Sequence, residues 1–310
     1  MQVLFISSSL SNGEPSPIIQ SQAHALSEQG MDINYYGLKN KGFIGYFREI
    51  FLLKKQLRHH TCHIYHAHYG LSAIVATLAG ARPLVVSLMG SDVKEGGWQQ
   101  FLIKQFAKRR WAATIAKSQE LADIVGNKYC KVIPNGVDMD LFKPLSKQQC
   151  RKHINLEQDK TYVLFAANPD RPEKNFALAK DAFDNLNLEQ AELLYLQNVP
   201  HSEIPLWMNA ADVVLLTSLW EGSPNVIKEA MSCNRPIVST AVGDVRMLID
   251  NLSNCYVVDG EVEDFSTAIL SALRSKEVKK YYGRQKLRSL QLDSKTVANE
   301  IISLYKTVIT

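Results

Sequence analysis

Hydrophobic residues along the chain alternate between short continuous runs and longer stretches with helical spacing. Continuous runs such as Val3–Ser7, Tyr162–Ala166 and Val213–Leu216 are typical of strands buried on both faces of a parallel sheet. A loop and a helical stretch follow the first run, and the helix predicted from about Ile18 to Gln29 is ended by Gly30. This alternation predicts an α/β fold built from doubly wound, Rossmann-like sheets.

The chain has 310 residues, which is long for a single hydrophobic core, so two domains are expected. We place the first in residues 1–145 and the second in residues 146–294. Pro134 and Gly136 of the segment VIPNGVDMDLFKP (132–144) predict a turn where the chain leaves the first domain. Apolar residues at helical spacing predict a final helix over residues 295–310.

Candidate chemistry concentrates between residues 212 and 250. There Ser223 is a suitable N-cap and Pro224 a suitable first residue for a helix that runs to about Cys233. Glu221 precedes this helix and Glu229 lies eight residues further on, inside it. The backbone N–H groups of a first helical turn attract a phosphate, and here they belong to the residues around Asn225, Val226 and Ile227. A carboxylate on each side of an anion site suits a sugar nucleotide.

A second group of candidate residues follows the strand at 162–166. Arg171 and Lys174 lie in the loop ahead of a helix predicted to start near Asn175. Cations at the end of a strand, facing the start of a helix, would hold a diphosphate. The alternative is a pair of solvated loop residues, because basic side chains are common in loops.

The segment from Glu221 through GSPNVIK to Glu229, continuing as AMSCNRPIVSTAVGDV, resembles the nucleotide-binding segment of glycosyltransferase family 4 (glycosyltransferase group 1). The mark of this family of retaining GT-B enzymes is Glu-x7-Glu. The segment at 132–144 resembles the inter-domain segment of the same family. The resemblance implies two domains facing a central cleft, with an acceptor-side domain at 1–145 that the helix at 295–310 completes, and a nucleotide-sugar domain at 146–294.

The resemblance also implies roles for individual residues. Glu221 would orient the transferred sugar, Glu229 would anchor the ribose, and Lys174 with Arg171 would clamp the diphosphate, so that Glu221, Lys174 and Arg171 are the catalytic candidates. Other donor-binding candidates are Gly222, Ser223, Asn225, Val226, Ile227 and Val199, with Pro200, Gly243 and Asp244 nearby. In the first domain, Gly13, Met89 and Gly90 are expected near the acceptor or the sugar. Met89 stands where the family has a histidine, a departure that affects any catalytic role there, because a thioether is a weak hydrogen-bond acceptor and not a donor.

Charge is unevenly distributed along the chain. Residues 1–150 hold 17 basic against 10 acidic side chains, and the remainder holds 18 against 21. Residues 43–58 form an amphipathic stretch with aromatic residues on one side, and residues 94–117 combine basic and aromatic residues again. Both patterns fit helices that lie on an anionic membrane, and equally helices packed on the core with a charged solvent-facing rim. No nucleic-acid motif is present, so no nucleic-acid partner is expected.

The remaining features concern location and cofactors. No run of about 20 apolar residues is present, and the N-terminal segment has the pattern of a first strand, not of a signal peptide. Five cysteines without a C-x-x-C pair suggest a reducing cytosol. We therefore expect a cytoplasmic protein, with peripheral association with the inner face of the cytoplasmic membrane as the open alternative. No metal ion or other cofactor is expected, since no D-x-D-like site compels one.

The function expected from these features is retaining transfer of a sugar from a nucleoside diphosphate sugar to an acceptor hydroxyl. By resemblance, the acceptor is a glycan or a lipid-linked glycan in the biosynthesis of a bacterial surface polysaccharide (capsule, O-antigen or exopolysaccharide). Two alternatives stay open. One is a non-catalytic subunit that binds a nucleotide sugar, and the other is a GT-B epimerase.

Overall fold

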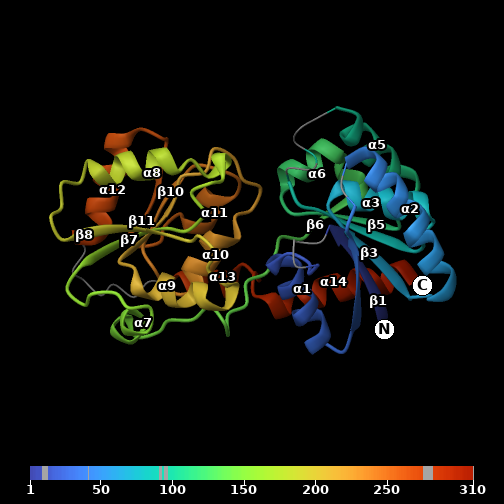
Figure 1. Cartoon of the computed structure of the whole chain (residues 1–310), viewed down its shortest axis with the longest axis horizontal. Coiled ribbons are helices and arrows are strands. Elements are labelled where there is room, and N and C mark those ends of the chain that lie inside the picture. Colours follow the sequence, from blue (N-terminus) through green and yellow to red (C-terminus); the bar gives the residue numbers. More distant parts are fainter. Residues whose placement is uncertain (9–12, 41, 91–92, 94–96, 275–281, 310) are drawn as a thin grey trace. The chain divides into compact units, whose positions relative to one another are not determined.

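The computed structural model describes residues 1–8, 13–40, 42–90, 93, 97–274 and 282–309 (Figure 1). The chain divides into two compact units. Unit 1 consists of residues 1–136 and 294–310, and unit 2 of residues 137–293. Among the described residues, no helix combines the length and the apolar character needed to cross a membrane.

The centre of unit 1 is a six-stranded parallel sheet in the order β2-β1-β3-β4-β5-β6. Its strands are β1 (Gln2–Ser8), β2 (Asp32–Leu38), β3 (Ile64–His68), β4 (Leu84–Leu88), β5 (Ala113–Ala116) and β6 (Cys130–Val132). In the central strands β3 and β4 every residue is buried, as expected for strands covered on both faces of a parallel sheet.

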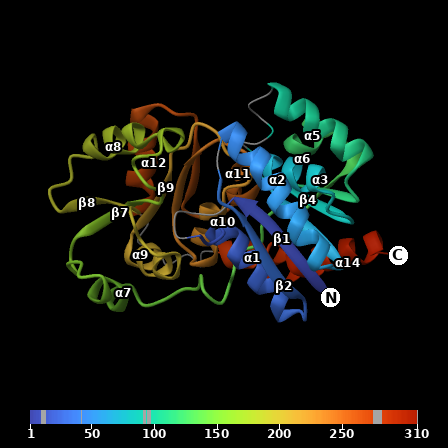
Figure 2. The ribbon, with the colours of Figure 1, turned by 45° about the vertical axis from the view of Figure 1, so that its right-hand side comes forward.

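Helices cover both faces of this sheet (Figure 2). One face packs against α1 (Pro17–Glu28) and α14 (Ser294–Ile309). The other packs against α2 (Gly42–His59), α3 (Gly70–Ala79), α5 (Gly97–Arg109) and α6 (Gln119–Val125), and a short 3-10 helix, η1 (Asn127–Tyr129), precedes β6. Ser118 caps α6, since its hydroxyl accepts a hydrogen bond from Leu121 N.

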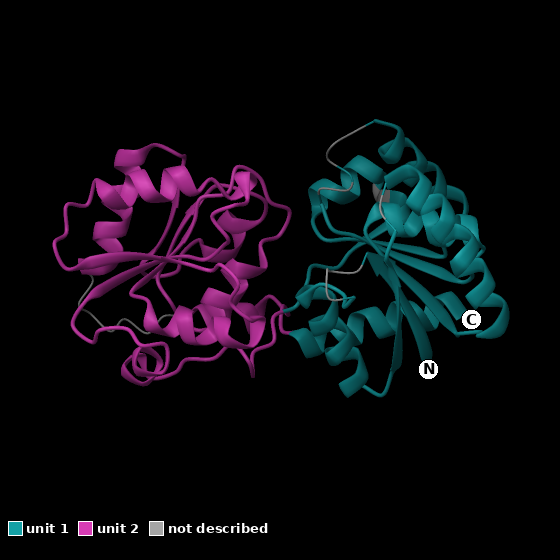
Figure 3. Cartoon of the chain, in the orientation of Figure 1, with its two compact units in different colours: residues 1–136, 294–310 teal, residues 137–293 magenta. Residues whose placement is uncertain are grey.

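The last helix of the chain belongs to the core of unit 1 (Figure 3). Helix α14 packs against α1 and buries Val297, Ile301 and Tyr305. The Tyr305 hydroxyl lies 2.5 Å from His66 Nδ1 on β3, and His66 Nε2 lies 2.8 Å from Ser87 Oγ on β4. Burial keeps the pKa of His66 well below its ordinary value. His66 is therefore a histidine packed in the core of unit 1.

Unit 2 contains a five-stranded parallel sheet in the order β11-β10-β9-β7-β8. Its strands are β7 (Thr161–Phe165), β8 (Ala191–Tyr195), β9 (Val213–Leu216), β10 (Ile237–Thr240) and β11 (Cys255–Val258). One face packs against α8 (Phe176–Asp184) and α12 (Val262–Arg274). The other packs against α9 (Ile204–Ala210), α10 (Asn225–Ser232), α11 (Val245–Ile249) and α13 (Gly283–Ser289), with α7 (Lys147–His153) against α9.

Both sheets are doubly wound, so the α/β class predicted from the sequence is confirmed. The change between the units falls at residues 136 and 137, whereas the sequence pattern suggested residue 145. Val137, Met139 and Phe142 are buried in the core of unit 2. The segment that resembles an inter-domain linker thus already packs as part of unit 2.

Candidate functional site: a carboxylate–lysine pair at the edge of the unit 2 sheet

The topology of unit 2 brings two loops together that are distant in sequence. Strand β7 pairs with β8 on one side and with β9 on the other, so the winding of the chain reverses between β7 and β9. In open parallel sheets, ligands bind outside the carboxyl ends of the strands at such a reversal. The loops at residues 166–175 and 217–224 both leave the sheet at this point.

Hydrogen bonds hold these two loops against each other. The Thr217 hydroxyl donates to the carbonyl oxygens of Lys174 and Asn175, at 2.9 Å each. Leu219 N donates to Glu173 O at 2.9 Å. Between them lies the 3-10 turn η2 (Pro172–Lys174), which ends at Asn175 in the left-handed conformation with a φ of 54°. The backbone position of Lys174 is therefore fixed from the neighbouring loop.

The side chains of Lys174 and Glu221 form an ion pair between these loops. Both are largely enclosed, with 14% and 18% of their side chains exposed. Ser218 Oγ also donates to Glu221 Oε1 at 2.9 Å. The structure therefore brings together two residues that the sequence placed in separate motifs.

Arg171, the third catalytic candidate, is held differently. Its Nε and Nη2 atoms donate to Glu173 Oε1 at 2.8 and 2.5 Å, and its side chain is 57% exposed. Arg171 lies in the same loop as Lys174, but its guanidinium pairs with Glu173 and not with the Lys174–Glu221 pair.

Helix α10 starts next to Glu221, at Asn225. The predicted N-cap at Ser223 is wrong, because the residue before the helix is Pro224, with φ −69° and ψ 117°, and no side chain caps the helix. Because Asn225 and Val226 lie in the first turn of α10, their N–H groups have no intrahelical acceptor. Ile227 N donates to Pro224 O at 3.3 Å. Asn225 Oδ1 is buried and has no hydrogen-bond partner among the described residues.

Gly222 and Gly243 make a close backbone contact beside this helix start. Gly243 has a φ of 54°, and a Cβ atom placed on it would lie 2.3 Å from Gly222 O. The loop after β10 therefore supports the Glu221 loop directly, and only glycine fits at residue 243.

Glu229, inside α10, is paired with a histidine that sequence reasoning missed. His201 Nε2 lies 3.4 Å from Glu229 Oε1, in the 3-10 turn η3 (His201–Glu203). The hydrogen bond to Glu229 and the charges of Glu229 and Asp138 raise the pKa of His201, although burial opposes them. His201 follows Val199 by two residues, so its place in the loop expected near the nucleobase was the available signal.

Lys228 is the second residue that the sequence did not reveal. Its side chain is fully buried, which is rare for a lysine. Burial lowers the pKa of Lys228 to about 8, although the Asp244 and Glu229 carboxylates favour the charged form. Burial likewise raises the pKa of Asp244, while Lys228 opposes that shift. Lys228 and Asp244 therefore influence each other's charge inside unit 2.

The weaker candidates of the sequence lie in unit 1. Gly13, with a φ of 85°, belongs to the segment after β1. Met89 and Gly90 directly follow β4, and Gly90 has a φ of 134°. All three follow carboxyl ends of strands in the unit 1 sheet, and the structure assigns them to a different unit from the other candidates.

Comparison with known proteins identifies the family on both units. Residues 22–141 match the family model described as Glycosyltransferase Family 4, and residues 149–275 match the model described as Glycosyl transferases group 1. Among curated proteins, the chain is 24% identical over 232 residues to the putative teichuronic acid biosynthesis glycosyltransferase TuaC of Bacillus subtilis, a match that covers 66% of this chain and 59% of TuaC. It is 26% identical over 239 residues to the lipopolysaccharide core biosynthesis mannosyltransferase LpsB of Rhizobium meliloti, covering 66% of each protein.

Two solved structures share the fold over nearly the whole chain. Sucrose-phosphate synthase from Thermosynechococcus elongatus superposes with a TM-score of 0.83 at 14% identity and covers 99% of both chains. HepE of Anabaena, in complex with UDP and glucose, gives a TM-score of 0.77 at 17% identity and covers 99% of this chain and 100% of HepE. The chain spans only part of the length of the curated relatives it matches: 59% of TuaC and 60% of the D-inositol 3-phosphate glycosyltransferase of Streptosporangium roseum. Together, the two family matches and the shared fold show that this chain belongs to glycosyltransferase family 4, the group 1 glycosyltransferases of GT-B fold.

Proposed function

We propose that unit 2 binds a nucleoside diphosphate sugar and that the chain transfers the sugar, with retention, to an acceptor hydroxyl. The observation that supports this most directly is the enclosed Lys174–Glu221 pair beside the start of α10, at the reversal of the unit 2 sheet. A cation, a carboxylate and unpaired helix N–H groups meet there, and these groups match a diphosphate linked to a sugar.

The proposed reaction separates charge at this point. The bond between the anomeric carbon and the diphosphate oxygen breaks, negative charge grows on the departing diphosphate, and the acceptor oxygen bonds to the same face of the sugar. Lys174 and the N–H groups of Asn225 and Val226 would stabilise the departing charge. Each preorganised donor of this kind is worth roughly 3–4 kcal/mol. Arg171 would join them by exchanging Glu173 for a phosphate oxygen.

The two glutamates receive different roles in the proposal. Glu221 would accept hydrogen bonds from hydroxyls of the transferred sugar, next to the cation that binds the diphosphate. Glu229 would accept hydrogen bonds from the ribose, with His201 fixing the orientation of its carboxylate. Gly222, Ser223 and Ile227 would line the site, and Val199 would contact the base.

The acceptor side of the proposal rests on relatives. TuaC and LpsB are described as enzymes of teichuronic acid and lipopolysaccharide core biosynthesis. HepE has been solved with UDP-glucose bound. We therefore propose a UDP-type donor and a glycan or lipid-linked glycan acceptor, used at the inner face of the cytoplasmic membrane in surface-polysaccharide assembly. Unit 1 would bind the acceptor near Gly13, Met89 and Gly90.

Donor binding can be tested by thermal shift with a panel of nucleoside diphosphate sugars, because a ligand that binds only the folded state raises the melting temperature. One donor should stabilise the wild type, and Lys174→Met and Glu229→Ala should lose that shift. Lys180→Met, which removes an exposed lysine paired with Asp184 on α8, should keep it. A panel without any stabilising nucleotide sugar would refute the proposal.

Transfer itself needs a second measurement with the stabilising donor and a glycan acceptor. The product should carry the same anomeric configuration as the donor, and Lys174→Met should lower kcat roughly a hundredfold or more. Activity should persist in EDTA, since the protein's own cations neutralise the diphosphate in this proposal. Donor binding without turnover in the wild type would instead identify a non-catalytic subunit, and release of an altered free sugar would identify an epimerase.

A further inference from the structure

Helix α2 presents most of its aromatic side chains to solvent. Only Glu49 and Leu53 of its 18 residues are buried. Phe43, Phe47 and Phe51 are 87%, 58% and 59% exposed, and Ile44 is 83% exposed. These four residues form the α2 ridge and lie outside the unit 1 core, whereas Leu53 is buried in that core and Tyr46, Ile50 and Leu57 pack against it. The helix therefore packs on the core along one side and leaves the ridge exposed. Such contiguous exposed apolar surface marks an interaction site.

The charge around the α2 ridge is positive. Four basic residues of the helix are exposed: Arg48, Lys54, Lys55 and Arg58. Its one acidic residue, Glu49, is buried and accepts hydrogen bonds from the Tyr36 hydroxyl at 3.0 Å and from the backbone N–H groups of Lys39 and Asn40 at 3.1 and 3.0 Å. Because Glu49 faces inward, it does not offset the basic surface outside.

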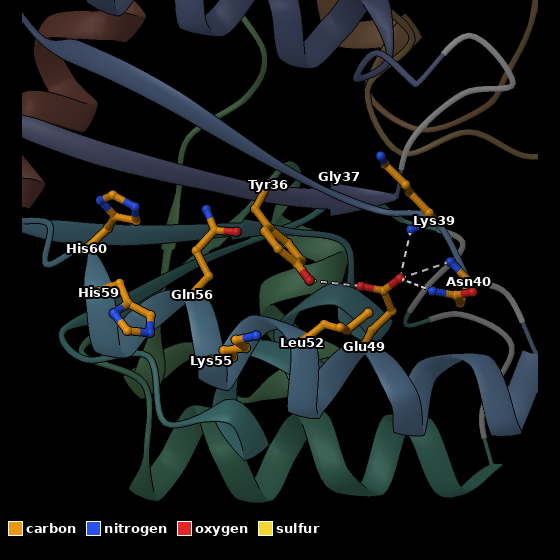
Figure 4. A pocket seen from close by; sticks show the side chains of 10 residues that line it. All are labelled: Tyr36, Gly37, Lys39, Asn40, Glu49, Leu52, Lys55, Gln56, His59 and His60. Carbon is orange, nitrogen blue, oxygen red and sulfur yellow. Dashed lines mark hydrogen bonds between the residues drawn. The ribbon is translucent and has the colours of Figure 1, made fainter.

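An open pocket of about 660 Å³ lies between α2 and the end of β2. Figure 4 shows Glu49 bonded to Tyr36 and Asn40 toward one end, and Gln56, His59 and His60 toward the other. Lys39 and Lys55 also line this pocket. Its cationic and amide groups suit a phosphate-bearing head group.

Helix α5 also combines exposed aromatic side chains with basic residues. It exposes Trp98 and Phe101, which are 58% and 62% exposed, and contains no acidic residue. Both α2 and α5 pack against α3, on the same face of the sheet. Two neighbouring helices thus combine exposed aromatic rings with basic residues.

We propose that α2, its pocket and α5 dock on an anionic phospholipid bilayer. The ridge rings enter the boundary between head groups and acyl chains, the exposed lysines and arginines contact the anionic surface, and the pocket between α2 and β2 receives a lipid phosphate. Positive charge around an apolar helix face is the combination that binds such membranes, because burial of the rings and attraction to anionic lipids add. This inference is independent of the proposed transferase activity.

Vesicle co-sedimentation of the full chain tests this surface. Wild-type protein should bind vesicles of phosphatidylglycerol and phosphatidylcholine, and bind pure phosphatidylcholine far more weakly. Phe47→Ser/Phe51→Ser should lower the affinity for the anionic vesicles about tenfold or more. Lys39→Gln/Lys55→Gln, which removes both lysines of the pocket, should also lower it about tenfold. Because the four residues are exposed, each variant should melt within a degree or two of the wild type.

Matched controls come from unit 2. Leu188→Ser/Met247→Ser removes two exposed apolar residues, and Lys143→Gln/Lys152→Gln removes two exposed lysines. Both should bind anionic vesicles like the wild type. Equal binding to neutral and anionic vesicles would overturn the proposal, as would wild-type binding by Phe47→Ser/Phe51→Ser. A wild-type dimer in sedimentation velocity that this variant dissociates, without vesicle binding, would make the ridge an interface between copies instead.

Discussion

At the scale of single residues, the contact between Gly243 and Gly222 shows how closely the site is packed. Gly243 has a positive φ, and a Cβ atom placed on it would lie 2.3 Å from Gly222 O, so there is no room for a side chain. Gly260 offers a comparison, because its φ of 98° is also positive but nothing lies within 4 Å of its would-be Cβ atom. The two glycines therefore separate backbone strain from steric contact.

We predict that Gly243→Ala destabilises the chain by about 3 kcal/mol or more, because the strain of a left-handed alanine adds to a backbone clash. Gly260→Ala should cost only about 1–2 kcal/mol. Chemical denaturation measures both, and the donor-induced thermal shift should fall for Gly243→Ala alone. Equal destabilisation by the two variants would contradict the close contact.

The His201–Glu229 pair predicts a pH dependence of stability. The pKa of His201 is raised in the folded state, so the folded chain binds the proton more tightly than the unfolded chain does. This contribution is fully present below the unfolded pKa of about 6.5 and is lost as the pH rises through the folded pKa.

His201→Gln should therefore lower the melting temperature more at pH 5.5 than at pH 8.5. The comparison is made on the variant and the wild type in the same buffers. His153→Gln, on exposed surface of α7, serves as the control and should give no such trend. A loss that grows toward alkaline pH would contradict the pairing.

Sequence patterns identified the residues of the site whose chemistry follows from their motif, and missed those that depend on packing. Glu221 and Lys174 could be named because each follows a strand in a recognisable segment. Their contact could not, since it depends on β9 pairing with β7. Lys228 was missed because periodicity alone does not show that a lysine is buried, and Ser223 was misassigned because Pro224 adopts extended and not helical angles.

At the scale of elements, α10 is held from its carboxyl-terminal side by α13. Arg284 donates from Nη1 to Phe142 O at 2.7 Å and from Nη2 to Met139 O at 2.6 Å. Its Nη1 also lies 3.0 Å from Ser232 Oγ, at the end of α10. One guanidinium therefore joins two helices to the segment at 139–142.

Arg284→Met should destabilise unit 2 by about 2–3 kcal/mol, because several buried carbonyl groups lose their donor. Arg288→Met, on the exposed side of the same helix, should change stability by less than about 0.5 kcal/mol. Urea denaturation compares the two. If both variants unfold at the same urea concentration, the guanidinium does not join these elements.

The sequence predicted the elements themselves well. The strands at 3–7, 162–166 and 213–216 and the helix at 18–29 lie within one residue or so of β1, β7, β9 and α1. Continuous apolar runs and glycine stops are local signals, which explains this agreement. The exposure of the α2 ridge could not be predicted from the sequence pattern, because helical periodicity defines an apolar face but does not show whether another element covers it.

At the scale of the whole molecule, the chain returns to its first unit after completing the second. Helix α14 supplies Val297, Ile301, Ile302 and Tyr305 to the unit 1 core. Its removal would expose the face of the sheet that it shares with α1. Local pattern predicted this helix, whereas its place in unit 1 was implied by the family resemblance and not by the pattern itself.

Truncation after Asp293 should unfold unit 1, because each of the buried side chains removed contributes about 1.5–3 kcal/mol and the stability of a domain is only about 5–15 kcal/mol. Hydrogen exchange should show loss of protection across β1 to β6 and retained protection in β7 to β11. Deleting residues 307–310 removes no fully buried side chain among the residues that the structure describes and should leave both patterns unchanged. Intact protection of β1 to β6 after the long truncation would show that unit 1 does not need α14.

The pairing of Lys174 with Glu221 has a consequence for selectivity under the proposed function. The two charges compensate each other, so a ligand that separates them has to provide a new partner for each. Inorganic phosphate or a nucleotide without its sugar would compensate the Lys174 ammonium but would not replace the lysine beside the Glu221 carboxylate. Only a molecule that offers an anion and neighbouring hydroxyls satisfies both. The pair would thus favour binding of the intact sugar nucleotide. When the ion pair forms again after transfer, it would also favour release of the remaining nucleotide.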